Sequence, residues 1–193
     1  YEGSFEAVIL GNGVYSLRDG DKIITKLASC MRKIKLGDGL ASSTDIGPLI
    51  NTDACQKVEN YIRIGIEEGA NIKVGGNVAK MQGTFFEPTL FTNVTPDMKI
   101  AREEIFGPVV SVLSVNSFDE AVEVHNCIDY GLSSSIYTKN MNLAFRAVKE
   151  LSAGITYINS STIGSETHMP FGGIKDSGNI KAVSYTHLTL PTN

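Results

Sequence analysis

Cysteine and histidine are the side chains of this sequence that most readily act as nucleophiles, proton carriers or metal ligands near neutral pH. Three histidines and three cysteines, Cys30, Cys55 and Cys127, form neither a C-x-x-C pair nor a zinc-ligand cluster. All three cysteines fall in predicted helices, Cys30 and Cys55 on apolar stripes, where burial makes thiols poor nucleophiles. We therefore reject all three and assign no catalytic residue. His168 stands alone in a polar loop and could be an acid or base, but we interpret it as solvent-exposed or bonded to its loop.

That polar loop, Ser160–Gly178, is the strongest candidate in the sequence for a ligand-binding segment. It is rich in Gly, Ser and Thr, has neither helical nor strand periodicity, and directly follows a predicted strand, Gly154–Asn159. A long loop after a parallel strand lies at the C-terminal edge of the sheet, where α/β folds place ligand sites. Long loops within a compact domain are usually functional.

The elements that must position this loop alternate between helix and strand in the second half of the chain. This order predicts a three-layer α/β fold with a mostly parallel sheet and crossover helices. Pro88 argues for an edge position or a bend in its strand, Ser117 and Asn140 are predicted N-caps, and the apolar residues of the last helix should lie along one face. The helices are expected at Asp19–Lys35, from Thr52 to Glu68, at Asp97–Ile105, and after Ser117 and Asn140; the strands at Ala70–Val74, Phe85–Val94, Val109–Leu113, Leu132–Tyr137 and Gly154–Asn159; the last helix's stripe is Met141, Ala144, Phe145, Val148 and Leu151.

Composition limits the class of protein. A chain of 193 residues with 42% hydrophobic and 20% charged residues is an ordinary globular sequence, and its length favours one domain. A net charge of −4 without a basic run argues against nucleic acid and anionic membrane as partners. No apolar run is long enough to cross a bilayer, no signal peptide is visible, and three scattered cysteines fit a reducing cytosol. We therefore expect a cytoplasmic protein.

Several motifs in register resemble the NAD(P)-dependent aldehyde dehydrogenase superfamily, over the C-terminal part of its catalytic domain. Glu103–Val109 reads E-E-I-F-G-P-V and matches the family's E-E-x-F-G-P-V signature, and Phe171–Gly178 matches its P-F-G-G-x-K-x-S-G loop. Further segments follow in the family's order: Lys35–Leu40, Asp45–Ile50, Gly75-Gly76, Phe86–Leu90, Tyr130–Ser133 and Ala153–Asn159. The similarity covers about Lys22 to Asn179.

The resemblance implies roles for three residues. Glu104 would hold both hydroxyls of the nicotinamide ribose, because a carboxylate accepts two hydrogen bonds in a fork; the alternative is a solvated glutamate near a helix end. Phe106 would pack beside the nicotinamide, or serve as a core aromatic leading into the next strand. Phe171 would line the mouth of the substrate tunnel, or simply plug its loop. No metal is implied.

Other residues of the same loop are interpreted as structural. Gly172 and Gly173 permit backbone shapes closed to other residues. Asn159 is expected to tie the loop down through its amide. Lys175 is expected to be a loop or interface residue.

The ends of the chain depart from the family pattern. Residues 1–18 match poorly, residues 19–179 are the expected catalytic-domain portion, and residues 180–193 look foreign, a divergent native terminus being the alternative. The family's nucleophilic cysteine, its water-activating glutamate, its transition-state asparagine and its nucleotide-binding loop are all expected upstream of this chain. Where the thiol should fall, Tyr1–Phe5 contains no cysteine.

The resemblance therefore implies a fragment of an enzyme that oxidises an aldehyde, with a weak pointer to a small semialdehyde, to a carboxylic acid with NAD or NADP. The parent enzyme is expected to be a homo-oligomer, and the fragment alone is expected to be inactive. The alternative is a non-catalytic α/β module that binds a nucleotide or holds an assembly together.

Overall fold

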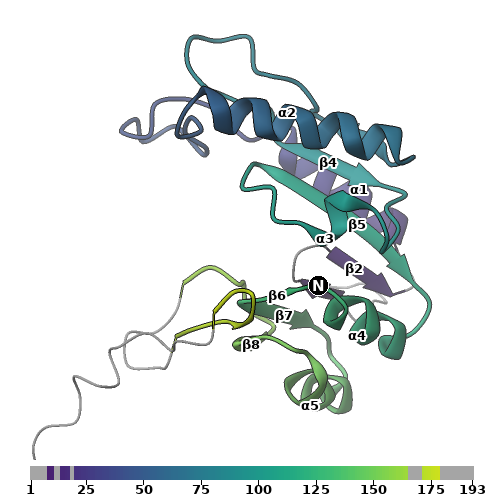
Figure 1. Ribbon diagram of the computed structural model, residues 1–193. Coiled ribbons are helices and arrows are strands. Elements are labelled where there is room, and N and C mark those ends of the chain that lie inside the picture. Colours follow the sequence, from purple (N-terminus) through teal and green to yellow (C-terminus); the bar gives the residue numbers. More distant parts are fainter. Residues whose placement is uncertain (1–7, 11–13, 18–19, 165–170, 179–193) are drawn as a thin grey trace, which may run out of the picture. The chain divides into compact units, whose positions relative to one another are not determined.

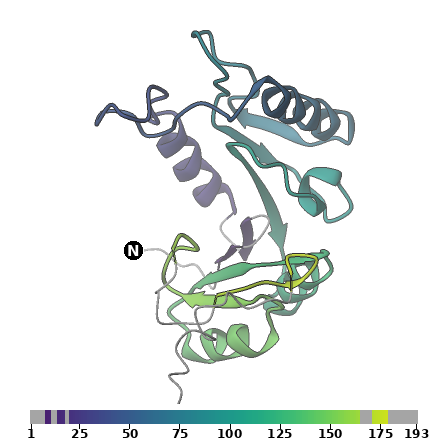
Figure 2. The ribbon, with the colours of Figure 1, turned by 60° about the vertical axis from the view of Figure 1, so that its left-hand side comes forward.

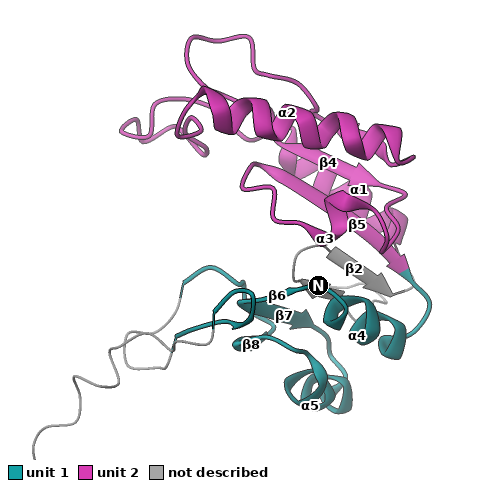
Figure 3. Ribbon diagram, in the orientation of Figure 1, with its two compact units in different colours: residues 1–11, 115–193 teal, residues 12–114 magenta. Residues whose placement is uncertain are grey.

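The computed structural model describes residues 8–10, 14–17, 20–164 and 171–178 (Figure 1). The chain divides into two compact units, unit 2 with residues 12–114 and unit 1 with residues 1–11 and 115–193 (Figure 3). His168 and the 180–193 tail lie outside the described residues. No helix among the described residues has the length and apolarity needed to cross a membrane.

Unit 2 is built on a sheet with strand order β3-β4-β5-β2. Strand β4 pairs antiparallel with β3 and parallel with β5, with Thr89 opposite Val109. Figure 2 shows α1 on one side of these strands and α2 and α3 on the other, so that this unit has three layers. The elements are β2 Val14–Leu17, α1 Gly20–Met31, α2 Thr52–Glu67, β3 Asn71–Val74, β4 Thr89–Thr92, α3 Lys99–Arg102 and β5 Val109–Val115.

The core of unit 2 lies where α2 meets the sheet and α3. Val58 and Ile62 on α2 are buried, as are Leu90 and Phe91 on β4. A Cβ built on Gly65 would come within 3.0 Å of side-chain atoms of both Phe91 and Ile100, so a larger residue there would require these side chains to shift. Helix α2 is therefore anchored to the sheet and to α3, and it can support the residues that pack against it.

Unit 1 repeats the strand–helix alternation with β1 Val8–Leu10, α4 Phe118–Asn126, β6 Tyr130–Gly131, β7 Ser133–Tyr137, α5 Met141–Glu150, β8 Ile155–Ile158 and β9 Ile174–Lys175. Strand β7 pairs parallel with β8 and antiparallel with β1, and β6 pairs antiparallel with β9. The α/β fold of the expected class is confirmed, and its sheet is mixed.

Both predicted N-caps are confirmed. The backbone N–H of Glu120 donates to Ser117 Oγ at 3.0 Å, and Asn140 Oδ1 accepts from the backbone of Asn142 and Leu143. The Glu120 side chain also reaches back to the start of the helix. Its carboxylate accepts a hydrogen bond from the backbone N–H of Asn116, the residue before the N-cap. These bonds satisfy N–H groups that a helix cannot pair internally.

The edge position predicted from Pro88 is wrong. Strand β4 is an interior strand, and Pro88 precedes it, so the missing N–H removes no ladder bond. On α5, Met141, Phe145 and Val148 are 69%, 64% and 50% exposed, whereas Ala144, Ala147 and Leu151 are buried. The helix packs through its small residues, which permit close approach to its neighbours.

Candidate cofactor and substrate site

The Glu103–Pro108 loop connects α3 to β5 and packs on α2. The backbone of Glu103 is extended, with φ −105° and ψ 149°, and Phe106 takes the left-handed region at φ 57°. A Cβ on Gly107 would lie 2.4 Å from Cγ2 of Val58, so the loop can approach α2 only with a glycine there. Gly107 of the E-E-I-F-G-P segment is therefore required by the close packing of the loop on α2.

Two residues one turn apart on α2 hold this loop. Lys57 Nζ donates to the backbone carbonyl of Glu104 at 3.2 Å and lies 5.4 Å from the centroid of the Phe106 ring. The hydroxyl of Tyr61 donates to Glu103 Oε2 at 2.5 Å. Sequence reasoning gave no role to either residue. The i, i+4 spacing that puts both on one face was the available signal.

The predicted cofactor residues Glu104 and Phe106 lie together in this loop. Glu104 is half-buried, and no described residue forms an ion pair or hydrogen bond with its carboxylate. Phe106 is 79% exposed, so it is not the core aromatic of the alternative interpretation. Glu103, Glu104, Phe106 and Gly107 line an open depression of about 250 Å³. Among the described residues, the site offers a carboxylate without a hydrogen-bond partner beside an exposed aromatic ring.

Phe171 and the loop that follows it belong to unit 1. Lys175 Nζ donates to the backbone carbonyls of Asn126 and Ile128, both at 2.7 Å, and so binds the loop to the C-terminal end of α4. The backbone N–H of Gly131 donates to Ser177 Oγ at 3.1 Å. Phe171 itself is partly exposed. Lys175 is therefore a loop anchor, in line with the sequence interpretation.

The amide of Asn159 works at the neighbouring strand end. Its Oδ1 accepts from the backbone N–H of Thr138 at 2.9 Å, and its Nδ2 donates to the carbonyl of Thr138 at 3.1 Å. These two bonds clamp the ends of β7 and β8 together. The two bonds hold the start of the polar loop in place. Asn159 was predicted to tie this loop down through its amide, and the described residues show that contact at the start of the loop.

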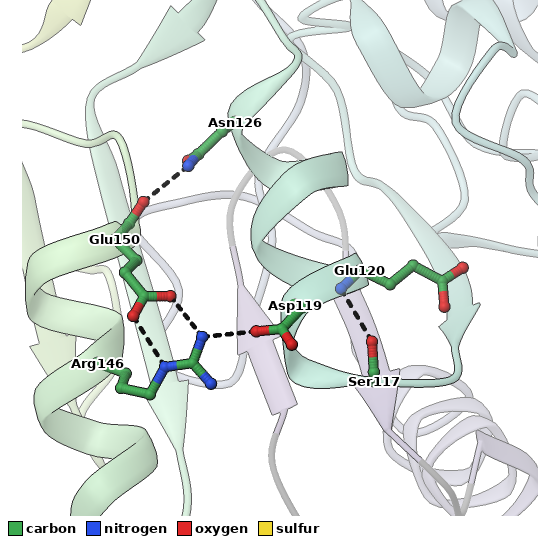
Figure 4. A network of polar contacts seen from close by, with 6 residues as sticks. All are labelled: Ser117, Asp119, Glu120, Asn126, Arg146 and Glu150. Carbon is green, nitrogen blue, oxygen red and sulfur yellow. Dashed lines mark hydrogen bonds and ion pairs between the residues drawn. The ribbon is translucent and has the colours of Figure 1, made fainter.

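The helices beneath this loop are joined by a charged network (Figure 4). Arg146 on α5 contacts Glu150 at 2.8 Å and reaches Asp119 on α4 at 2.5 Å. Its hydrogen bonds hold the pKa of the Glu150 carboxyl below its ordinary value. Asn126 Nδ2 donates to the carbonyl of Glu150 at 2.7 Å. The C-terminal end of α4, where Lys175 binds, is thereby fixed to α5.

His125 is a buried histidine on α4, and its protonation should change the free energy of unfolding. Its Nε2 lies 2.5 Å from Ser134 Oγ and its Nδ1 3.1 Å from Asn126 Oδ1. Burial lowers the pKa of His125; the Asn126 bond opposes this shift and the charge of Lys175 adds to it. The unfolded state therefore binds more protons below about pH 6.5, its ordinary pKa.

We expect the contribution of His125 to the free energy of unfolding to be fully present above about pH 6.5. Below that pH this contribution should fall, by up to about 1.4 kcal/mol per pH unit. Urea unfolding measured between about pH 7.5 and pH 5, for the chain and its His125→Gln variant, isolates this contribution. The parent should lose more stability than the variant across that range. Equal slopes would contradict the prediction.

Comparison with known proteins decides the family. Residues 16–189 match the model of the Aldehyde dehydrogenase family. The chain belongs to the aldehyde dehydrogenase family. It is 41% identical to the betaine aldehyde dehydrogenase of Mesorhizobium japonicum over 162 residues, 82% of this chain and 33% of that protein. It is 40% identical to a succinate-semialdehyde dehydrogenase [NADP(+)] of Schizosaccharomyces pombe over 159 residues, with 82% and 32% covered.

A solved aldehyde dehydrogenase has the same fold. The betaine aldehyde dehydrogenase of Staphylococcus aureus, in complex with NAD+, superimposes with a TM-score of 0.83 at 35% identity, covering 86% of this chain and 35% of that one. The chain thus spans about a third of the length of the aldehyde dehydrogenases that it matches. The family match extends past Asn179, and the foreign character of the tail stays a prediction.

Proposed function

We propose that this chain takes part in the oxidation of an aldehyde to a carboxylic acid with NAD(P)+, and that the Glu103–Gly107 loop holds the nicotinamide half of the cofactor. The observation that carries this proposal is the half-buried Glu104 carboxylate, which no described residue pairs, next to the exposed ring of Phe106. When bound, NAD(P)+ supplies the hydride acceptor. Relatives named for betaine aldehyde and for semialdehydes support small aldehydes as the substrate class.

Each residue of the site has a defined task in this proposal. Glu104 accepts hydrogen bonds from both ribose hydroxyls and thereby fixes the rotation of the nicotinamide ribose. Phe106 offers an apolar face against which the nicotinamide ring stacks. Lys57 keeps the loop on α2 through the Glu104 carbonyl. Phe171 forms part of an apolar wall for the aldehyde. A cytoplasmic location and a homo-oligomeric parent remain predictions.

The proposal is tested by titrating the ¹⁵N-labelled chain with NAD+ and, as a control, with ADP, which lacks the nicotinamide riboside. NAD+ should shift the amide signals of residues 104–107, and ADP should leave them in place. Glu104→Gln should remove the NAD+ response. Shifts that are equal for NAD+ and ADP, or that lie only elsewhere, would overturn the assignment.

We further expect that the 193-residue chain produces no NAD(P)H from any aldehyde. Cys55 is buried as predicted, and the Cys127 thiol donates to the carbonyl of Val124. Cys30 is exposed, which corrects the expected burial, but it lies in the last turn of α1, whereas reactive thiolates are favoured at helix N-termini. NAD(P)H absorbance is the measurement. Turnover that disappears when one of the three cysteines is replaced by serine would refute this expectation.

A further inference from the structure

The two adjacent glutamates of the E-E-I-F-G-P segment have different surroundings. Glu103 Oε2 accepts the hydrogen bond of the Tyr61 hydroxyl at 2.5 Å, and Glu103 Oε1 lies 3.7 Å from Lys99 Nζ. No described residue bonds the Glu104 carboxylate. The backbone of Glu103 is extended, and in extended backbone successive side chains point to opposite sides. Of the two glutamates, Glu103 is therefore the one held by α2, and the carboxylate of Glu104 is the one without a described partner.

We infer that Tyr61 is a positioning residue for the cofactor loop: its hydroxyl holds Glu103 against α2, so that Glu104 is presented to the ribose. This inference rests on the proposed function of Glu104. Tyr61 lies in the helical turn between Val58 and Ile62, both buried, so its ring starts from a fixed backbone. A hydrogen bond from a fixed donor to a charged acceptor is among the stronger polar contacts in proteins.

Two lysines near the loop, Lys99 and Lys57, do not replace the contact between Tyr61 and Glu103. Lys99 and Glu103 form a partly exposed ion pair at 3.7 Å, and pairs of that kind contribute little. Lys57 reaches the backbone carbonyl of Glu104 and therefore does not set the direction of either carboxylate. Its ammonium also lies 5.7 Å from the Tyr61 ring centroid, so the ring and the hydroxyl of Tyr61 have separable contacts.

Tyr61→Phe separates them, because it keeps the ring over Lys57 and removes only the hydroxyl. We expect amide hydrogen exchange of residues 103–107 to become about tenfold faster, because a hydrogen bond to a charged group is lost from a local opening equilibrium. The NAD+ response of the same amides should weaken by a factor of about three to ten, while any response to ADP is unchanged. Exchange in the core of α2 should stay as in the parent.

Glu59→Gln is the matched control, because Glu59 is exposed on the same helix and lies two residues before Tyr61. It should change neither exchange nor NAD+ binding. Glu103→Ala removes the partner and leaves Tyr61 in place, so it tests the same contact if Tyr61→Phe fails to fold. If the two side chains act through each other, the double variant should be no worse than the more affected single variant.

The two measurements separate failure of this inference from failure of the proposed function. Exchange needs no cofactor: unchanged exchange at residues 103–107 in both single variants overturns the positioning role of Tyr61. A parent chain whose loop amides ignore NAD+ refutes the cofactor assignment, while the exchange result still decides whether Tyr61 holds the loop. Faster exchange with an unchanged NAD+ response would also overturn the inference, since the contact would then be structural only.

Discussion

Gly154→Ala is expected either to lower the stability of the chain or to displace the Phe171–Gly178 loop, which packs against residue 154. A Cβ at residue 154 would stand 1.8 Å from the carbonyl oxygen of Gly172 and 3.1 Å from Cα of Gly173. Both are backbone atoms and cannot rotate away as a side chain could. Overpacking typically costs about 1–3 kcal/mol, and a backbone collision lies at the upper end of that range unless the loop moves.

Urea unfolding combined with amide hydrogen exchange distinguishes the two responses to this clash. Either the free energy of unfolding falls by about 3 kcal/mol, or exchange at β9 and Ser177 rises sharply because the loop has left its place. Gly39→Ala is the matched control, since its Cβ would meet nothing within 4 Å, and it should change stability by less than about 0.5 kcal/mol. A Gly154→Ala variant with parental stability and protection would disprove the close packing.

Features that depend on neighbours in sequence were predictable for this chain. The caps at Ser117 and Asn140 form as expected, because a side chain bonds backbone groups two or three residues away. The second helix was predicted to end at Glu68, and Gly69, the next residue, has φ 101°. The parallel pairs β4–β5 and β7–β8 follow from the strand–helix alternation.

Features that depend on tertiary neighbours were not predictable. The periodicity of α5 contains two adjacent stripes, and the alanine stripe is buried because close packing, not hydrophobicity, decides which face fits the sheet. The antiparallel pairing of β3 has no sequence signal of its own. Tyr61 lies 42 residues before its partner Glu103 and Lys57 lies 47 before Glu104, so no local pattern connects them.

The candidate site divides in the same way. Glu104 and Phe106 were named because the resemblance marks their positions, and the structure adds that one carries a carboxylate without a described partner and the other an exposed ring. The resemblance gave no role to Glu103, whose contact with Tyr61 only the structure shows. The structure separates the two glutamates by their contacts: Tyr61 on α2 bonds the Glu103 carboxylate, and no described residue bonds that of Glu104.

The sharpest functional prediction is that Glu104→Gln lowers cofactor affinity or hydride transfer by about one to two orders of magnitude. The amide keeps the shape of the side chain but loses the charge that accepts both ribose hydroxyl protons, and a hydrogen bond to a charged group contributes about 1.5–3 kcal/mol. A suitable assay is a chimera in which residues 16–189 replace the matching part of the Staphylococcus aureus betaine aldehyde dehydrogenase, with steady-state kinetics at varied NAD+.

Stability should hardly change in the same variant, because the Glu104 carboxylate has no partner among the described residues that the substitution could remove. Glu59→Gln, an equal change of charge at an exposed position of α2, should leave both kinetics and melting temperature within about 0.5 kcal/mol of the parent. A solvated Glu104 without a ligand would behave like that control. A large kinetic loss with a parental melting curve therefore identifies a side chain that serves the cofactor, and unchanged kinetics would refute the ribose clamp.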